Sequence, residues 1–337
     1  MKKLLDQVET MVEDALDGFV WAFPQYLRRL PGSYVLARVE PKGTGKVGIV
    51  SGGGSGHEPA HGGYVGYGML DAAVAGEVFT SPTPDQILEG IRAANHGAGV
   101  LLVIKNYTGD VMNFEIAQDL AREEGIPTEA VVVNDDVAVD DSLYTTGRRG
   151  IAGTIFVHKI AGALAEAGAS LESVRDGAKE VIHHVRSMGF ALTPCTVPAA
   201  GQPSFTLADT EMEMGIGIHG EPGTHRQQVR PARELAHEIL RQIAADLSLK
   251  PGEDVACIIN GMGATPLLEL AVFAKDVAEW FHQAELHPKF VMMGEFMTSL
   301  DMAGASISVL RLSEDMRQGL WAACDTPAWR QGVKYDQ

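Results

Sequence analysis

Short apolar runs alternate with amphipathic stretches along this chain, and this alternation constrains the fold more than any other feature. The apolar runs are rich in valine and isoleucine, and they lie at residues 47–50, 100–104, 130–133, 258–259, 290–292 and 307–310. The stretches between them have helical spacing, at residues 84–94, 114–124, 151–167, 171–187, 232–247, 266–281 and 313–323. Strands that alternate with helices are typical of α/β proteins. We therefore predict an α/β fold with mixed, largely parallel sheets that are flanked by helices.

The length and the distribution of glycine and proline predict two domains. A chain of 337 residues is long enough for about two domains. Glycine, proline and small polar residues accumulate between residues 188 and 224, and a long irregular stretch of this kind is more often functional than idle. We predict an N-terminal α/β domain over residues 1–188 and a C-terminal α/β domain over residues 189–337.

The charge balance narrows the class of partner. A formal net charge of -17 argues against nucleic acid or an anionic membrane as a partner, because both need a basic face. The three cysteines are far apart, which makes a disulfide framework or a zinc site improbable. The first residues have the spacing of an amphipathic helix rather than of a signal peptide, and no apolar run reaches membrane-spanning length. A cytoplasmic location is therefore expected.

A glycine-rich segment, SGGGSGHEP at residues 51–59, follows the first predicted strand. Four glycines within five residues let backbone amides approach a bound group, although a purely structural turn is an alternative. The segment is not a Walker A motif, because no Lys-Ser or Lys-Thr follows its last glycine. His57 and His61 flank Glu58, but the nearby glycine and proline argue against a helix, and no third ligand is evident. We therefore expect no metal site here.

A polar cluster, KNYTGD, follows the second predicted strand. It contains Lys105 and Asp110 among residues 105–110. Such side chains are costly to bury and useful for binding hydroxyl groups. A polar turn in which Asp110 caps the following helix is the competing interpretation.

A third cluster, MGIGIHGEPG, surrounds His219 at residues 214–223. Histidine can act as a base, an acid, a nucleophile or a ligand near neutral pH. A lone histidine is usually a surface or core residue, so a functional role and a structural role stay open here.

An acidic patch follows the third predicted strand. Its four aspartates are Asp135, Asp136, Asp140 and Asp141. They could bind magnesium, but solvated carboxylates in a turn are the commoner interpretation.

Taken together, these segments resemble the dihydroxyacetone kinase family, in particular its substrate-binding subunit. The resemblance rests on long, ordered motifs at residues 51–70, 76–87, 104–115, 135–150, 195–223, 263–270 and 298–304. It implies that His219 binds the ketone carbonyl covalently as a hemiaminal. It also implies that His57 and Asp110 contact the hydroxyl that is phosphorylated, and that one of them is its base. Gly54, Ser55, Gly56 and Lys105 are implied to line the same substrate site.

The resemblance also implies what other molecules complete the reaction. It implies a bacterial arrangement in which a separate nucleotide-binding subunit donates the phosphoryl group, so this chain itself carries no cofactor. ADP or ATP and Mg²⁺ are expected on that partner, which a phosphotransferase-system protein recharges or which exchanges ATP. A homodimer is expected. The alternatives are a kinase subunit for another small ketose such as erythrulose, and a non-catalytic regulator that senses a ketose.

Overall fold

The computed structural model describes residues 2–40, 43–140, 142, 144–221 and 223–333. Contacts within it divide the chain into two compact units. The first unit contains Lys2–Val133, Ile155–Val181 and Glu314–Gln337, and the second contains Asn134–Thr154 and Ile182–Ser313. The chain passes between the units near residues 134, 155, 182 and 314. This division differs from the single boundary predicted at residue 188, which lies inside strand β7 (Val185–Ala191).

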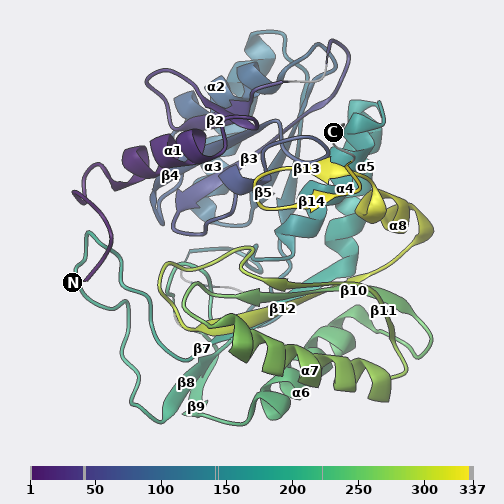
Figure 1. The fold of residues 1–337 in the computed structure, drawn as a ribbon. Helices are drawn as coiled ribbons and strands as arrows, with labels where there is room; N and C mark the ends of the chain where they lie inside the picture. The colour runs from purple at the N-terminus through teal and green to yellow at the C-terminus, as the bar shows by residue number, and fades with distance from the viewer. Residues whose placement is uncertain (1, 41–42, 141, 143, 222, 334–337) are drawn as a thin grey trace. The chain divides into compact units, whose positions relative to one another are not determined.

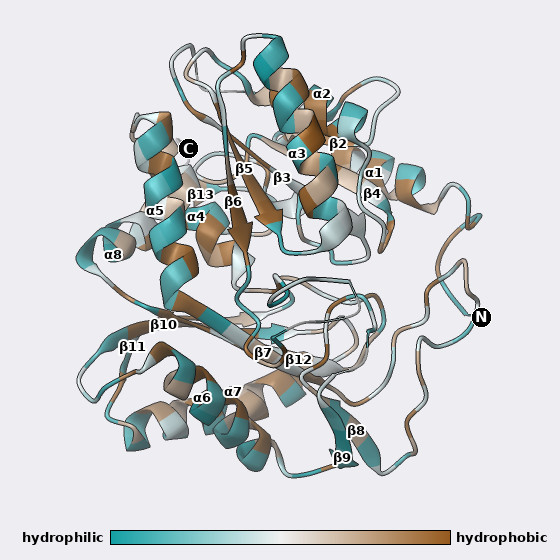
Figure 2. Ribbon diagram, turned by 180° about the vertical axis from the view of Figure 1, so that it is seen from behind, coloured by the Kyte–Doolittle hydropathy of each residue, from teal (hydrophilic) through white to brown (hydrophobic). Residues whose placement is uncertain are grey.

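The first unit is built on a six-stranded mixed sheet (Figure 1). Its strand order is β1 (Leu27–Arg29), β2 (Val35–Arg38), β4 (Ala72–Val78), β3 (Gly48–Ser55), β5 (Val100–Lys105) and β6 (Thr128–Val133). Strands β4, β3, β5 and β6 pair in parallel, whereas β1 and β2 form an antiparallel edge. Figure 2 shows β5 and β6 as hydrophobic along most of their length, as is expected of parallel strands covered on both faces.

Helices α2 (Pro84–Ala94) and α3 (Thr108–Glu123) pack against each other and against this sheet. Their apolar residues join those of the strands in one core, which includes Ile87, Ile91, Leu102 and Phe114. The remaining elements of the first unit are α1 (Met11–Ala22), the 3₁₀ turn η1 (Gly62–Tyr64), α8 (Glu314–Trp321), β13 (Cys324–Asp325) and β14 (Arg330–Gln331). Most of α4 (Thr154–Glu166) and α5 (Leu171–His184) also belongs to it.

The second unit contains the other six-stranded sheet. Its order is β11 (His287–Gly294), β10 (Asp254–Gly261), β12 (Gly304–Arg311), β7 (Val185–Ala191), β8 (Glu211–Met214) and β9 (His225–Gln228). Helices α6 (Ala232–Leu247) and α7 (Leu267–Gln283) lie side by side on this sheet and bury their apolar faces against it (Figure 1). Two mixed sheets flanked by helices confirm the predicted α/β class.

The predicted predominance of parallel pairing is wrong for the second sheet. There only β10 and β11 are parallel, and they are joined by the crossover helix α7. The other neighbouring strands of this sheet run antiparallel. A parallel pair needs a crossover connection, whereas antiparallel strands need none.

Among the described residues, no helix is long and apolar enough to cross a membrane.

Candidate functional site

The glycine-rich segment is a strand along most of its length rather than a loop. Strand β3 continues through Gly53 and Gly54 to Ser55, alongside β4. A Cβ atom on Gly53 would lie 3.0 Å from Nζ of Lys105 and 3.3 Å from Oδ2 of Asp110, and the residue has φ +152°. Two charged side chains therefore lie over the backbone of Gly53, where a Cβ atom would be in tight contact with both.

Lys105 and Asp110 converge because a strand end leads directly into a helix. Lys105 is the last residue of β5 and is fully buried, with Nζ 5.3 Å from the ring centroid of Tyr107. Asp110 lies in the first turn of α3 and is 2% exposed. Burial raises the pKa of the Asp110 carboxyl, and the positive charge of Lys105 opposes this rise. The pair thus places an ammonium group and a carboxylate with raised basicity at one strand end.

His57 lies in the same unit and is fully buried. Its ring stacks on that of Phe79, with centroids 5.2 Å apart and an interplanar angle of 17°. Phe79 adopts a left-handed conformation (φ 56°), which is rare for a residue with a large side chain. Such strain persists only where the surroundings enforce it, and it occurs most often at functional sites.

Ser81 joins this group, and sequence reasoning gave it no role. Its hydroxyl hydrogen-bonds the Asp110 carboxylate and opposes the rise in the pKa of that carboxyl. Both Ser81 and Phe79 lie in the stretch 76–87, which was noted only as one of the resembling motifs. Their position just beyond the end of β4, beside β3, was the signal that could have identified them.

The other predicted residues of the glycine segment are engaged differently. The Ser55 hydroxyl donates to the carbonyl of Gly76 at 2.7 Å. The Gly56 amide donates to both carboxylate oxygens of Glu58 at 3.1 Å. Gly54 packs against the backbone of the turn after β4, since its Cβ would lie 2.6 Å from the amide nitrogen of Thr80. Within this segment it is Gly53 that faces Lys105 and Asp110.

Two buried histidines lie close to Lys105 and stay neutral. Nδ1 of His61 is 3.0 Å from Nε2 of His158, a residue that sequence reasoning missed. Burial, followed by the charge of Lys105, lowers the pKa of His158 to about 3 and that of His61 well below its ordinary value. Because these two imidazoles are neutral, neither of them adds a positive charge beside Lys105.

These shifts predict an acid-sensitive first unit. A histidine stabilises the folded state if its pKa is lower there than in the unfolded state. This contribution is complete above about pH 6.5, and it is lost as the pH falls toward the folded pKa. The folded value for His158 is about 3. We expect the free energy of unfolding to fall from about pH 7.5 to about pH 5.5 by about 1.4 kcal/mol more in the wild type than in His158→Gln. Urea unfolding at both pH values measures this difference, and equal losses in the two proteins would contradict buried neutral His158.

His219 lies in the second unit, in the loop between β8 and β9. Its Nδ1 atom is buried, and its side chain as a whole is partly exposed. Its backbone amide donates to Oε2 of Glu221 at 2.8 Å. The loop turns sharply at Gly215 (φ +66°) and Gly220 (φ +72°), where a larger residue would be strained.

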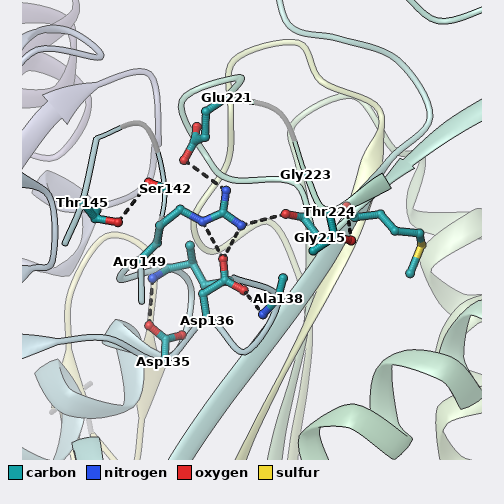
Figure 3. A network of polar contacts seen from close by, with 12 residues as sticks. Asp135, Asp136, Ala138, Ser142, Thr145, Arg149, Gly215, Glu221, Gly223 and Thr224 are labelled. Carbon is teal, nitrogen blue, oxygen red and sulfur yellow. Dashed lines mark hydrogen bonds and ion pairs between the residues drawn. The ribbon is translucent and has the colours of Figure 1, made fainter. Parts of the chain in front are cut away.

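A buried polar network stands behind this loop (Figure 3). The Arg149 guanidinium is fully buried and donates to the carboxylate of Asp136 through Nε at 2.8 Å. Its Nη1 atom is 3.5 Å from Oε1 of Glu221, and its Nη2 atom donates to the carbonyl of Gly215 at 2.7 Å. Burial raises the pKa of Asp136 to about 6, and the charge of Arg149 opposes that rise.

The predicted acidic patch of solvated turn carboxylates is therefore corrected for two of its members. Asp135 and Asp136 are both fully buried. Asp135 accepts the backbone amides of Ile151 and Gly153 at 2.8 Å each. Sequence reasoning could not see this, because the partners lie on other segments. Asp141 lies outside the described residues, and among those described no cluster of three or more metal-ligating side chains was found.

Comparisons with known proteins bear on both units. The family model described as the Dak1 domain matches residues 17–328. The "PTS-dependent dihydroxyacetone kinase 1, dihydroxyacetone-binding subunit DhaK" of Listeria innocua is 54% identical over 330 residues, which cover 98% of this chain and 100% of that protein. The chain belongs to the Dak1 domain family.

Two solved structures are similar to this chain along most of its length. The "Dihydroxyacetone kinase operon co-activator Dha-DhaQ" superimposes with a TM-score of 0.89 at 37% identity, over 95% of this chain and 99% of that one. The dihydroxyacetone kinase of C. freundii superimposes with a TM-score of 0.87 at 34% identity, over 100% of this chain and 61% of that one. Chains similar to this one therefore occur both in a dihydroxyacetone kinase and in an operon co-activator.

The arrangement in this Dak1 member suits two kinds of chemistry. In the first unit, a buried lysine and a carboxylate lie over the bare backbone of Gly53, a serine hydroxyl contacts that carboxylate, and the His57 imidazole stacks on Phe79. These groups suit the binding and deprotonation of a small polyhydroxy compound. In the second unit, the imidazole of His219 stands on a loop whose backbone is held by Glu221, which suits nucleophilic attack on a carbonyl.

Proposed function

We propose that this chain is the dihydroxyacetone-binding subunit of a dihydroxyacetone kinase. The observation that carries the proposal is the convergence of Lys105 and Asp110 over the bare backbone of Gly53. That arrangement is found in a chain that matches a dihydroxyacetone-binding subunit along its whole length. The substrate is dihydroxyacetone or a similar short ketose, which offers little apolar surface and so needs polar and covalent contacts.

In the proposed mechanism, His219 anchors the ketone. The lone pair of one ring nitrogen forms a bond to the carbonyl carbon, and the π pair of the C=O bond moves to the oxygen. That oxygen takes up a proton, and the other ring nitrogen releases one, so a neutral hemiaminal forms without net proton change. Glycerol has no carbonyl and cannot form this bond, which gives selectivity for ketoses.

In the first unit, His57 or Asp110 accepts the proton of the hydroxyl that is phosphorylated. The raised pKa of Asp110 makes it a stronger base than an ordinary aspartate, and His57 is held rigid by the ring of Phe79. Lys105 and Ser81 orient the ligand, and Gly54, Ser55 and Gly56 shape the same binding region. Phosphoryl transfer depends mainly on positioning and charge stabilisation, so such residues supply most of what this chain must contribute.

The phosphoryl group comes from a separate nucleotide-binding subunit, which holds ADP or ATP with Mg²⁺. The sequence of this chain contains no Walker A motif. In the proposed arrangement a phosphotransferase-system protein recharges the partner, and the chain works as a cytoplasmic homodimer. A kinase for a four-carbon ketose such as erythrulose would use the same residues.

A regulator that binds a ketose without phosphorylating it is the second candidate. The similarity to a co-activator over 95% of this chain favours it, because the two folds are closely alike. Turnover separates the two functions: a regulator would bind dihydroxyacetone and yield no product with any nucleotide-binding partner.

The test is reconstitution with the nucleotide-binding subunit of a Dak1 family kinase and its phosphoryl donor. We expect phosphorylation of dihydroxyacetone by the mixture, none by this chain alone, and none of glycerol. Faster turnover of erythrulose would move the assignment to that sugar. A folded chain that binds dihydroxyacetone and gives no product would support the regulator instead.

A further inference from the structure

The loop that carries His219 is held by a carboxylate from within the loop itself. Oε2 of Glu221 accepts the backbone amide of His219 at 2.8 Å, so the carboxylate folds back over the residue that bears the imidazole. Glu221 is only 3% exposed. Burying a carboxylate costs free energy unless hydrogen bonds or an opposite charge compensate for the lost hydration. Here a cation provides part of this compensation.

That cation is the guanidinium of Arg149. Its Nη1 atom lies 3.5 Å from Oε1 of Glu221, and its Nη2 atom donates to the carbonyl of Gly215, where the loop begins. Asp136 fixes the other edge of the guanidinium, at 2.8 Å from Nε and 2.6 Å from Nη2. Arg149 thus connects the start of the loop, its carboxylate and a buried aspartate on a different segment (Figure 3).

Gly217 provides independent evidence that the loop is built around this carboxylate. A Cβ atom there would lie 1.9 Å from Oε1 of Glu221 and 2.7 Å from Nη1 of Arg149. The backbone of the loop therefore passes so close to the ion pair that a Cβ atom at this position would overlap the carboxylate. The contact is tight enough that a single methyl group would displace the carboxylate from its present place.

We infer that Glu221 and Arg149 are positioning residues, which hold the backbone of His219 so that its imidazole is ready to add to a carbonyl. This inference rests on the proposed function of His219. Neither residue takes part in the addition. They act by restricting the loop, which reduces the ordering that adduct formation would otherwise require.

The test measures adduct formation directly in the full-length chain. Dihydroxyacetone labelled with ¹³C at its carbonyl is titrated into the wild type, Glu221→Gln and Gly217→Ala, and the ¹³C NMR signal of the tetrahedral carbon is followed. Losing a charge-assisted contact should weaken adduct formation by about tenfold or more in Glu221→Gln. Gly217→Ala should give a similar loss, although it removes no polar group.

The matched control is Glu253→Gln, which alters a loop carboxylate that accepts the Lys250 amide elsewhere in the same unit. It should leave the dissociation constant of the adduct unchanged. Circular dichroism at the titration temperature establishes the folded fraction of each protein. A purely structural role would lower that fraction without changing the dissociation constant of the protein that remains folded. If Glu221→Gln does not fold, Gly217→Ala and Arg149→Lys give the decisive constants.

The outcomes separate this inference from the proposed function. Suppose that folded Glu221→Gln and folded Gly217→Ala form the adduct with the same dissociation constant as the wild type and Glu253→Gln. This result would overturn the positioning role and would not affect the proposed function. Absence of an adduct in the wild type would overturn the role of His219 itself, and the positioning role with it.

Discussion

Replacing Asp110 by asparagine is expected to lower the kcat of the reconstituted kinase by about 10²- to 10⁴-fold, the range that a general base contributes. Asparagine fills nearly the same space but cannot accept the hydroxyl proton. Asp110 is 2% exposed and burial raises the pKa of its carboxyl, so the carboxyl has the environment of a catalytic base. The KM for the ketose should change much less than kcat, because the lost interaction belongs to the transition state.

The pH profile of the same variant distinguishes the two candidate bases. A carboxylate base must be ionised, so kcat of the wild type should fall as the pH drops through the raised pKa of Asp110. Asp110→Asn should lose this acidic limb if Asp110 is the base and should keep an acidic limb if it is not. Asp119→Asn, on the exposed side of the same helix, is the control and should behave as the wild type. Nearly unchanged kcat in both Asp110→Asn and His57→Gln would rule out both residues as the base.

Removing the imidazole of His219 is expected to have the second largest effect. In His219→Ala, kcat/KM for dihydroxyacetone should fall by about 10²-fold or more, mainly through a higher KM, because the covalent anchor contributes binding that a small polar ligand otherwise lacks. The preference for dihydroxyacetone over glycerol should shrink by a similar factor, since it depends on the carbonyl. Competition between the two substrates measures that preference.

The control for this substitution is His225→Ala. His225 lies at the start of β9, at the end of the same loop, and its side chain is exposed. It should leave kcat/KM unchanged. Full turnover by His219→Ala with unchanged discrimination would mean that selectivity for ketoses comes from noncovalent contacts alone.

Elements with a strong local signal were predictable from the sequence. Helix α6 has the predicted bounds, residues 232–247, because its apolar residues recur at helical spacing over its whole length. Strand β5 was predicted at 100–104 and spans Val100–Lys105. The sequence does not predict strand β4, since AAVAGEV consists mainly of alanine and glycine and has valine only at positions 74 and 78. The predicted helix over residues 171–187 includes the first three residues of strand β7, because β7 follows α5 without any intervening turn signal.

The candidate site was predictable where one short segment carries it. Lys105 and Asp110 are five positions apart, at the end of a recognisable strand, and the structure brings them together over Gly53. The pairing of His61 with His158 joins segments 97 residues apart, and Arg149 contacts Gly215 across 66 positions. No local pattern encodes such pairs. These contacts depend on the tertiary fold, which brings segments distant in the sequence close together.

The measurement that tests the central claim most directly is the ¹³C NMR spectrum of carbonyl-labelled dihydroxyacetone mixed with the wild type and with His219→Ala. Covalent anchoring predicts that the carbonyl signal of one ligand per chain moves to the range of a tetrahedral carbon in the wild type. It predicts no such signal in His219→Ala, while His225→Ala matches the wild type. A ligand that binds the folded wild type with its carbonyl signal unchanged would contradict the covalent role of His219.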